Sequence, residues 1–300
     1  PVKSPNKTKV KWGGFMKEVD KFDAQFFGLS PREAELLDPQ HRIFMETVWK
    51  AIEDAGYKAS DFSGTKTGIF VGICSMDYTE LFRENRIEIQ AQTTTGNAHT
   101  MLPNRISYFL NIHGPSEPID TACSSSIVAI HRAIESMRNG DCNTAIVGGV
   151  NVILNKHLYV AFTKAGMLCE DGRCKTFDRK ANGYVRGEGS AAVLLKPLSK
   201  AINDGDHIYA VIKGSAVNHG GKANSLTAPN PNAQAALIIN AWRKAGVDPA
   251  TATFIEAHGT GTSLGDPIEI NGLKKAFNQL YRDWGKEPSQ VPHCGIGAVK

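Results

Sequence analysis

The sequence lacks the long apolar runs, the strong charge of one sign and the paired cysteines that mark several classes of protein. No run approaches the roughly 18 to 20 apolar residues that a membrane span needs, and the first residues show no signal-peptide pattern. The 34 basic and 30 acidic residues leave a net charge of only +4, too little for a nucleic-acid-binding protein unless it gathers on one face. We therefore expect a cytoplasmic protein with no membrane span and no nucleic-acid partner.

Cysteine is scarce and scattered. The six cysteines lie at positions 74, 123, 142, 169, 174 and 294 without C-x-x-C spacing, which argues against a zinc site and against a secreted disulfide framework. Cys169 and Cys174 flank a predicted turn at Asp171 and Gly172, and their spacing does not suit zinc. No metal is expected, and at least one cysteine remains a candidate for a working thiol.

Strands and helices are predicted to alternate along the chain. Short apolar runs bounded by glycine or turn residues are typical of strands that are buried on both faces. Such runs lie at residues 67–73, 144–150 and 191–195, and further strands are predicted at residues 208–212 and 253–257. Helical patterns lie between them, so the sequence indicates an α/β fold with a largely parallel sheet.

Several helix boundaries carry capping signals. The predicted starts are Ser30 with Pro31 and Glu33, Asp38 with Pro39, and Asp266 with Pro267. Gly56 suits the end of the second helix, and a further helix is predicted over residues 233–245. The link at residues 197–206 is the best internal boundary, and it divides the chain into residues 1–200 and 201–300.

Cys123 is a candidate nucleophile because of its position. It follows the end of a predicted strand and stands at the start of an amphipathic helix. There, backbone N–H groups and the helix dipole favour a thiolate and can hold a developing oxyanion. A buried, inert cysteine is the alternative. Ala122 and the three serines that follow Cys123 leave room for a substrate to reach the sulfur, which favours the nucleophile.

His258 is the second candidate for chemistry. An apolar strand runs into it, and a loop of glycines and threonines follows before the helix at Pro267. Ligands of α/β sheets bind beyond the carboxyl ends of the strands, where this histidine is expected to lie. The hydroxyls of the loop add donors and acceptors, so we interpret the segment as part of a site.

Three rival motifs are weaker. Gly259, Gly261 and Gly265 are spaced one residue wider than the dinucleotide fingerprint, and the segment at Gly220–Lys222 lacks the other residues of a P-loop. Ser263 stands in a G-x-S-x-G pattern, but the predicted helix starts three to four residues later, unlike the sharp turn of serine hydrolases. A serine acyl hydrolase that uses Ser263 stays open as an alternative.

With these residues in view, the sequence resembles the ketosynthase (beta-ketoacyl synthase) domain of a modular type I polyketide synthase, in the thiolase-like superfamily. The matching segments include Leu37–Arg42, Gly114–Ser116, Asp120–Ser126, Lys164–Gly189, Val217–Asn230 and Glu256–Glu269. The resemblance implies a thiolase-like layered αβαβα fold made of two similar halves and truncated at both ends here. Residues 1–200 would be the N-terminal half with the nucleophilic cysteine, and residues 201–300 the incomplete start of the C-terminal half.

The resemblance also implies a reaction. Cys123 would take an acyl chain from the phosphopantetheine arm of an acyl carrier protein, and malonyl carrier protein would then be decarboxylated and condensed with that thioester. His258 would assist decarboxylation and stabilise the enolate oxygen. Thr260 and Thr262 would hydrogen-bond the pantetheine amides.

Further residues and partners follow from the same resemblance. Phe162 is a candidate for the acyl pocket, with a core aromatic as an equal alternative. Lys300 matches a lysine near the family's active site, and the family's second active-site histidine is expected beyond it, so we expect condensation from the intact parent and not from this segment alone. The resemblance implies no bound cofactor, a carrier-protein partner and a homodimer in the intact domain. A non-elongating, acyl-transferring ketosynthase is the alternative that the intact segment at His258 disfavours.

Overall fold

The computed structural model describes residues 5–223, 225–289 and 291–300. They form two compact units, each assembled from separate stretches of chain. The first, here called the sheet unit, contains residues 14–155 and 187–211, and the second, here called the loop unit, contains the described residues up to Gly13 together with residues 156–186 and 212–300. Within the described residues, no helix combines the length and the apolar character needed to cross a membrane.

The sheet unit is built on a four-stranded sheet in the order β3, β2, β4, β6. Its strands are β2 (Thr67–Gly72), β3 (Ser116–Ile119), β4 (Thr144–Asn151) and β6 (Gly189–Leu195). β2 pairs in parallel with both β3 and β4, whereas β6 runs antiparallel to β4. The predicted largely parallel sheet is therefore confirmed in this unit, with β6 as its antiparallel edge.

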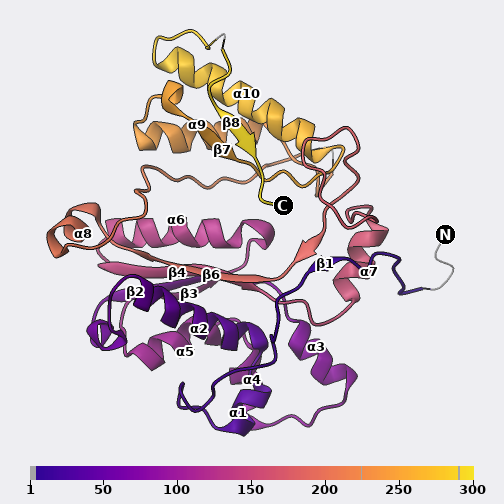
Figure 1. The fold of residues 1–300 in the computed structure, drawn as a ribbon, viewed down its shortest axis with the longest axis vertical. Helices are drawn as coiled ribbons and strands as arrows, with labels where there is room; N and C mark the ends of the chain where they lie inside the picture. Colours follow the sequence, from indigo (N-terminus) through magenta and orange to yellow (C-terminus); the bar gives the residue numbers. More distant parts are fainter. Residues whose placement is uncertain (1–4, 224, 290) are drawn as a thin grey trace. The chain divides into compact units, whose positions relative to one another are not determined.

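Helices cover both faces of this sheet. α6 (Ser125–Arg138) lies on one face, and α2 (Pro39–Asp54) and α5 (Met101–Leu110) lie on the other (Figure 1). The remaining helices of the unit are α1 (Pro31–Leu36), α3 (Asp77–Glu84), α4 (Ala91–Asn97) and α8 (Leu198–Asp204), with short 3-10 turns at Ala59–Phe62 and Ala122–Ser124. The predicted caps of α1 and α2 are confirmed, because the Ser30 and Asp38 side chains accept backbone N–H groups of the first turns.

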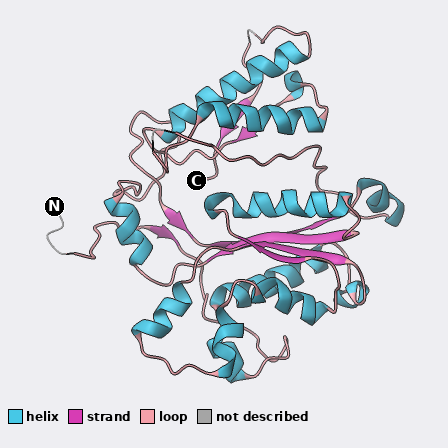
Figure 2. Ribbon diagram, turned by 180° about the vertical axis from the view of Figure 1, so that it is seen from behind, coloured by secondary structure: helices cyan, strands magenta, loops and turns pink. Residues whose placement is uncertain are grey.

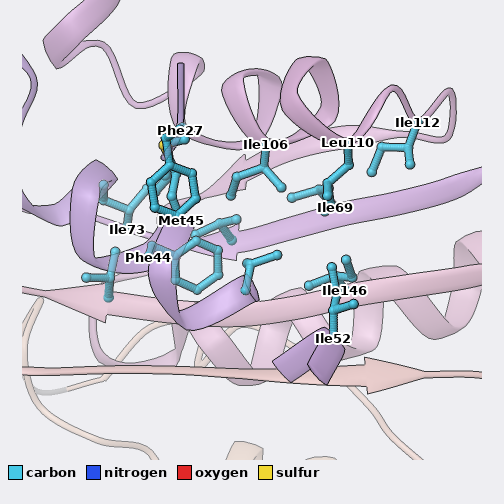
Figure 3. Packing of buried hydrophobic residues seen from close by; sticks show 14 of the residues in the cluster. Phe27, Phe44, Met45, Ile52, Ile69, Ile73, Ile106, Leu110, Ile112 and Ile146 are labelled. Atoms are coloured by element: carbon cyan, nitrogen blue, oxygen red, sulfur yellow. The ribbon is translucent and has the colours of Figure 1, made fainter. Parts of the chain in front are cut away.

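The hydrophobic core lies against both faces of β2 and β4. Every residue of β2 is buried, as its apolar run predicts. Successive side chains of a strand point to opposite faces, so Ile69 belongs to the cluster with Phe44 and Ile106 on the side of α2 and α5 (Figure 3). Phe70 belongs to the cluster with Ala129 on the side of α6. Burial on two sides explains why this strand carries no polar alternation.

The matching segment at residues 37–42 builds a buried polar frame at the start of α2. Gln40 Nε2 donates to the Ser75 carbonyl at 2.9 Å, which ties the chain after β2 to this helix. The Arg42 guanidinium donates to the Leu37 carbonyl at 2.8 Å and lies 5.7 Å from the centre of the Tyr78 ring. Gln40 therefore fixes the chain that follows β2, and Arg42 fixes the turn that precedes α2.

The loop unit contains helices and one small sheet. Its elements are α7 (His157–Lys164), α9 (Pro231–Ala245), the 3-10 turn Pro249–Thr251, β7 (Phe254–Glu256), α10 (Gly265–Asp283) and β8 (Gly295–Gly297). β7 and β8 pair in parallel, and α9 packs along α10 (Figure 2). The two-residue strands β1 (Gly13–Gly14) and β5 (Arg186–Gly187) lie where the chain passes from one unit to the other.

Three expectations about local structure are wrong. Residues 208–212 form no strand, because the described structure offers them no strand to pair with and the chain passes between units there. β6 is not buried on both faces, since it is an edge strand whose Val193 side chain is 46% exposed. α10 begins at Gly265, so Asp266 lies in its first turn and does not cap it.

Candidate active site

Cys123 lies in the sheet unit, on the 3-10 turn Ala122–Ser124 that leads directly into α6. β3 ends at Ile119, so strand, turn and helix follow one another closely. The Cys123 side chain is exposed, as a nucleophile that a substrate must reach has to be. The predicted position at a helix start is confirmed to within one turn.

The backbone just before Cys123 is strained. Ala122 has a φ of +56°, in the left-handed region that costs a residue with a side chain about 1 to 2 kcal/mol. Two side chains hold this conformation: Asp120 Oδ1 accepts the Ala122 N–H at 3.1 Å, and Ser125 Oγ donates to the Ala122 carbonyl at 2.6 Å. Strain of this kind is kept at functional sites, and here it sets the direction in which the next residue leaves the turn.

The serines beside Cys123 have a role that the sequence interpretation missed. Ser124 Oγ donates to the Thr121 carbonyl at 2.9 Å, and Ser125 Oγ accepts the Thr121 N–H at 2.9 Å. Ser126 packs against β2 so closely that a Cβ on Gly72 would lie 2.7 Å from its backbone nitrogen. Small side chains at these positions therefore serve the hydrogen bonds of the turn and close packing against β2.

His258 lies in the loop unit, two residues after the end of β7, and its side chain is exposed. The loop turns sharply behind it, because Gly259 has a φ of +50°. A Cβ on Gly259 would lie 2.5 Å from Thr176 Cγ2, so only glycine fits there. The Thr176 hydroxyl donates to the Gly259 carbonyl at 2.6 Å and holds this turn against the neighbouring segment.

Glu269, on the first turns of α10, accepts hydrogen bonds from the backbone of the loop that carries His258, here called the histidine loop. One carboxylate oxygen accepts the His258 N–H at 2.7 Å, and the other accepts the Gly259 N–H at 2.9 Å. Hydrogen bonds to an ionised carboxylate are stronger than those between neutral groups. The position of the His258 backbone is therefore set by α10.

Asp266 makes a second grip of the same kind. It is 4% exposed and accepts the Gly261 N–H at 3.1 Å and the Phe177 N–H at 2.7 Å. The two carboxylates lie three residues apart on one helix and so share a face. Together they fix two backbone segments, the loop at residues 258–261 and the segment at Phe177, to the start of α10.

Thr260 and Thr262 lie together on the loop, with their hydroxyl oxygens 3.1 Å apart. A cavity of about 450 Å³ opens beside Thr262 and is also lined by Phe177 and Arg179. Hydroxyl groups at the wall of a cavity can donate to or accept from the amides of a ligand. The Thr262 hydroxyl is thus placed where it could hydrogen-bond a polar ligand.

Lys300 and Phe162 also belong to the loop unit. Lys300 Nζ donates to the His258 carbonyl, which places its ammonium group next to the histidine backbone. Phe162, on α7, is half-buried, with its ring 5.6 Å from the Arg186 guanidinium and 6.4 Å from the Tyr184 ring. These contacts give Phe162 a packing role within its own unit.

Ser263 does not occupy a nucleophile elbow. β7 ends at Glu256 and α10 begins at Gly265, and Ser263 lies on the turn just before the helix, well after the strand. A serine hydrolase needs its serine on the strand-to-helix turn itself. The site geometry therefore gives this alternative no support.

The structure brings part of the predicted set together. His258, Thr260, Thr262 and Lys300 meet around one loop, and Cys123 lies in the other unit. The sequence interpretation missed the hydrogen bonds that Glu269 and Asp266 accept from the loop. Among the described residues, no group of three or more His, Cys, Asp or Glu side chains is placed to hold a metal ion.

Comparison with known proteins covers nearly the whole chain. The family described as "Beta-ketoacyl synthase, N-terminal domain" matches residues 1–201, and "Beta-ketoacyl synthase, C-terminal domain" matches residues 209–300. The chain is 55% identical over 300 residues to polyketide synthase PksN of Bacillus subtilis and 46% identical over 300 residues to polyketide synthase ThaG of Burkholderia thailandensis. Each alignment covers 100% of this chain but only 5% of the length of the relative.

Solved structures show the same likeness. The oxazolomycin ketosynthase domain OzmH KS7 of Streptomyces albus matches with a TM-score of 0.91 and 44% identity, over 99% of this chain and 50% of the other. The ketosynthase from module 6 of the bacillaene synthase of Bacillus subtilis matches with a TM-score of 0.87 and 41% identity, over 96% and 48%. The chain thus spans about half the length of these ketosynthases and shares their thiolase-like fold.

Proposed function

The chain belongs to the beta-ketoacyl synthase family, and from this premise we propose that it carries the nucleophile and the histidine loop of a polyketide ketosynthase, an acyltransferase. The proposed reaction is a decarboxylative condensation on substrates held by the phosphopantetheine arm of an acyl carrier protein. The carrier protein is the proposed partner, and a homodimer is the proposed assembly. No cofactor of its own is proposed.

In the proposed loading step, the Cys123 sulfur attacks the carbonyl carbon of the carrier-bound thioester. A new carbon–sulfur bond forms, the pantetheine sulfur leaves as the thiol with the proton, and the acyl chain stays on Cys123. The support for this role is the exposed thiol on a strained turn between β3 and α6. Backbone N–H groups at a helix start favour a thiolate and the negative oxygen of the intermediate.

In the proposed condensation step, malonyl carrier protein loses carbon dioxide and leaves an enolate. His258 stabilises the enolate oxygen, and the enolate carbon attacks the Cys123 thioester, whose sulfur leaves as a thiolate. The support for His258 is the double grip of Glu269 on the loop that carries it. Thr260 and Thr262 are proposed to bind the pantetheine amides beside the cavity next to Thr262.

One observation carries the proposal: an exposed cysteine stands on a strained strand-to-helix turn in a chain that matches both beta-ketoacyl synthase domains. Intact-protein mass spectrometry after incubation with an acyl carrier-protein thioester tests it. The chain should gain the mass of the acyl group, Cys123→Ala should gain none, and Ser263→Ala should gain it like the wild type. The reverse pattern would favour the serine hydrolase.

A second measurement separates condensation from plain acyl transfer. Malonyl carrier protein is added to the acylated intact parent domain, and the product on the carrier is identified by mass. Loss of the acyl group from Cys123 together with an elongated product supports condensation. A stable acyl enzyme without product supports the non-elongating alternative. His258→Ala should still be loaded but should form no elongated product.

A further inference from the structure

A second cysteine, far along the chain from Cys123, lies in a charged cluster of the loop unit. Cys169 Sγ lies 3.7 Å from Lys175 Nζ, donates to the Asp171 carboxylate and lies 3.1 Å from the Arg173 carbonyl oxygen. Lys175 Nζ lies 2.7 Å from both carboxylate oxygens of Asp171. The Cys169, Asp171 and Lys175 side chains therefore contact one another, and the Asp171 carboxylate accepts hydrogen bonds from both the thiol and the ammonium group.

The cluster combines a buried sulfur with charged side chains that are partly exposed to solvent. Cys169 is 0% exposed, while the side chains of Lys175 and Asp171 are 20% and 60% exposed. The Cys169 thiol and the Lys175 ammonium group hold the pKa of Asp171 down at about 2, so its carboxylate stays ionised and keeps both partners close. A buried cysteine that only packs is expected among apolar groups, and this one touches two charges. The proposed function uses none of the three side chains.

We propose that Cys169 and Lys175 form a reversible covalent bridge through a single oxygen atom, Sγ–O–Nζ, when the protein meets hydrogen peroxide. A covalent S–O–N unit is shorter than the present 3.7 Å between Sγ and Nζ, so the flexible Lys175 side chain must move inward to close the bridge. The Asp171 side chain is 60% exposed, so the cluster borders the solvent that supplies the peroxide.

The steps balance with peroxide as the only oxidant. The Cys169 sulfur attacks one peroxide, the O–O bond breaks, and sulfenic acid and water form. The Lys175 ammonium group first releases a proton to solvent, and the resulting amine attacks a second peroxide and becomes a hydroxylamine, again with release of water. The hydroxylamine oxygen then attacks the sulfenic sulfur, whose hydroxyl leaves as water. Sulfur and nitrogen each lose two electrons, and the two peroxides accept all of them.

The bridge has a structural consequence at the histidine loop. Lys175 directly precedes Thr176, whose hydroxyl holds the Gly259 carbonyl. The Lys175 backbone also lies behind Gly261, where a Cβ would come within 3.0 Å of the Lys175 nitrogen. A bridge that pulls Lys175 toward Cys169 changes the support of the loop. The effect on catalysis rests on the proposed function, whereas the formation of the bridge does not.

Tryptic peptide mapping of the folded chain after peroxide treatment tests the proposal, in a Cys123→Ala background that removes the exposed thiol. Trypsin should fail to cut after the modified Lys175. The peptide of residues 165–173 should then be joined to residues 174–179 with a gain of about 14 Da, the mass of one oxygen less two hydrogens. Dithiothreitol, which attacks the bridged sulfur and expels the hydroxylamine, should release residues 165–173 at their original mass and residues 174–179 with a retained gain of about 16 Da.

Matched variants make the result specific. Lys175→Arg keeps a positive charge beside Asp171 but has no primary amine, and Cys169→Ser has no sulfur, so both should lose the joined peptide. Cys174→Ser, at the neighbouring cysteine, should keep it. Three results would overturn the proposal: a gain of about 16 Da on Cys169 with normal cleavage after Lys175, a disulfide between Cys169 and Cys174, or an unmodified folded protein. Failure of acyl loading on Cys123 would leave the bridge untouched, so the two proposals fail separately.

Discussion

Glu269 holds His258 by its backbone, with a carboxylate oxygen 2.7 Å from the His258 nitrogen, and its other oxygen takes the next N–H group along the loop. Glu269→Gln keeps one acceptor and turns an amide donor toward a backbone donor, so one bond is lost. We expect the free energy of unfolding to fall by about 1 to 3 kcal/mol. The condensation rate should fall by about tenfold or more, while acyl loading of Cys123 persists. Denaturant unfolding and separate loading and condensation assays measure the two effects.

A charge-neutralising change on an exposed glutamate is the matched control. Glu88→Gln should leave unfolding, loading and condensation unchanged, because Glu88 is exposed in the sheet unit. Equal losses of loading and condensation in Glu269→Gln would contradict a role that acts through His258.

The tight turn at Gly259 gives a second prediction. Gly259→Ala adds a Cβ at 2.5 Å from Thr176 Cγ2 and at 2.7 Å from Ala298 Cβ, on a backbone with φ of +50°. Gly246→Ala faces a similar φ of +60° with no atom within 4 Å, so it isolates the backbone cost. We expect Gly246→Ala to lose about 1 kcal/mol of stability and Gly259→Ala about 2 to 4 kcal/mol. If both variants lost the same stability in thermal or urea unfolding, the loop at Gly259 would have to accommodate the added Cβ without strain.

The buried His41 makes a prediction about acid. Among the described residues, neither ring nitrogen of His41 has a hydrogen-bond partner. Burial lowers the pKa of His41 from 6.5 to about 3, so the unfolded chain takes up a proton that the folded state refuses. The neutral His41 ring therefore does not lower the free energy of unfolding above pH 6.5. As the pH falls from 6.5 toward 3, protonation of the unfolded chain lowers that free energy. His41→Gln should flatten the loss of stability in urea unfolding followed from neutral to acidic pH.

Asp38 acts in the opposite direction. Burial raises the pKa of Asp38 from 3.8 to about 6, so the folded state holds a proton more tightly than the unfolded chain does. Stability is therefore gained as the pH falls from 6 to 3.8, by up to about 3 kcal/mol. Asp38→Asn keeps the acceptor for the Gln40 N–H but removes this gain, so its acid loss should be steeper than that of the wild type. A profile identical to the wild type in both variants would contradict the two assignments.

The lysine at the end of β6 makes a prediction about a buried charge. Lys196 is 10% exposed, and its Nζ lies 2.6 Å from Asp206 Oδ2, 2.8 Å from the Tyr57 hydroxyl and within an ion pair of Asp204. Lys196→Met leaves the half-buried Asp206 without its cation, which should cost about 2 to 4 kcal/mol. The exposed Lys200→Met is the control and should change stability by about 0.5 kcal/mol or less. Equal denaturation midpoints for the two variants would rule out the stabilising pair.

Elements with a strong local signal could be predicted from the sequence. β2 is an unbroken apolar run, and α2 begins at an aspartate followed by proline, so each signal agrees with the packing that follows. The run at residues 208–212 has the same apolar character but no neighbouring strand in the described structure. A strand depends on its neighbours, and no property of the run itself reveals whether a neighbour is present.

The site was predictable in part for the same reason. The turn around Cys123 and the loop after β7 follow from residue types close together in the sequence. The grip of Glu269 on His258 spans eleven residues of sequence and a change of element. An acidic residue near a helix start is ordinarily explained by the helix dipole, and only the folded loop shows that its oxygens have other partners.

Asp266 and Glu269 lie on the same helix, so the position of α10 sets the position of both parts of the loop that they hold. A displacement of the start of α10 would therefore move the Gly261 and His258 backbone with it. α10 packs closely against α9 at Gly272, where a Cβ would lie 3.1 Å from the Gln234 side chain. The position of the His258 backbone thus depends on how α9 and α10 fit together at Gly272, outside the loop itself.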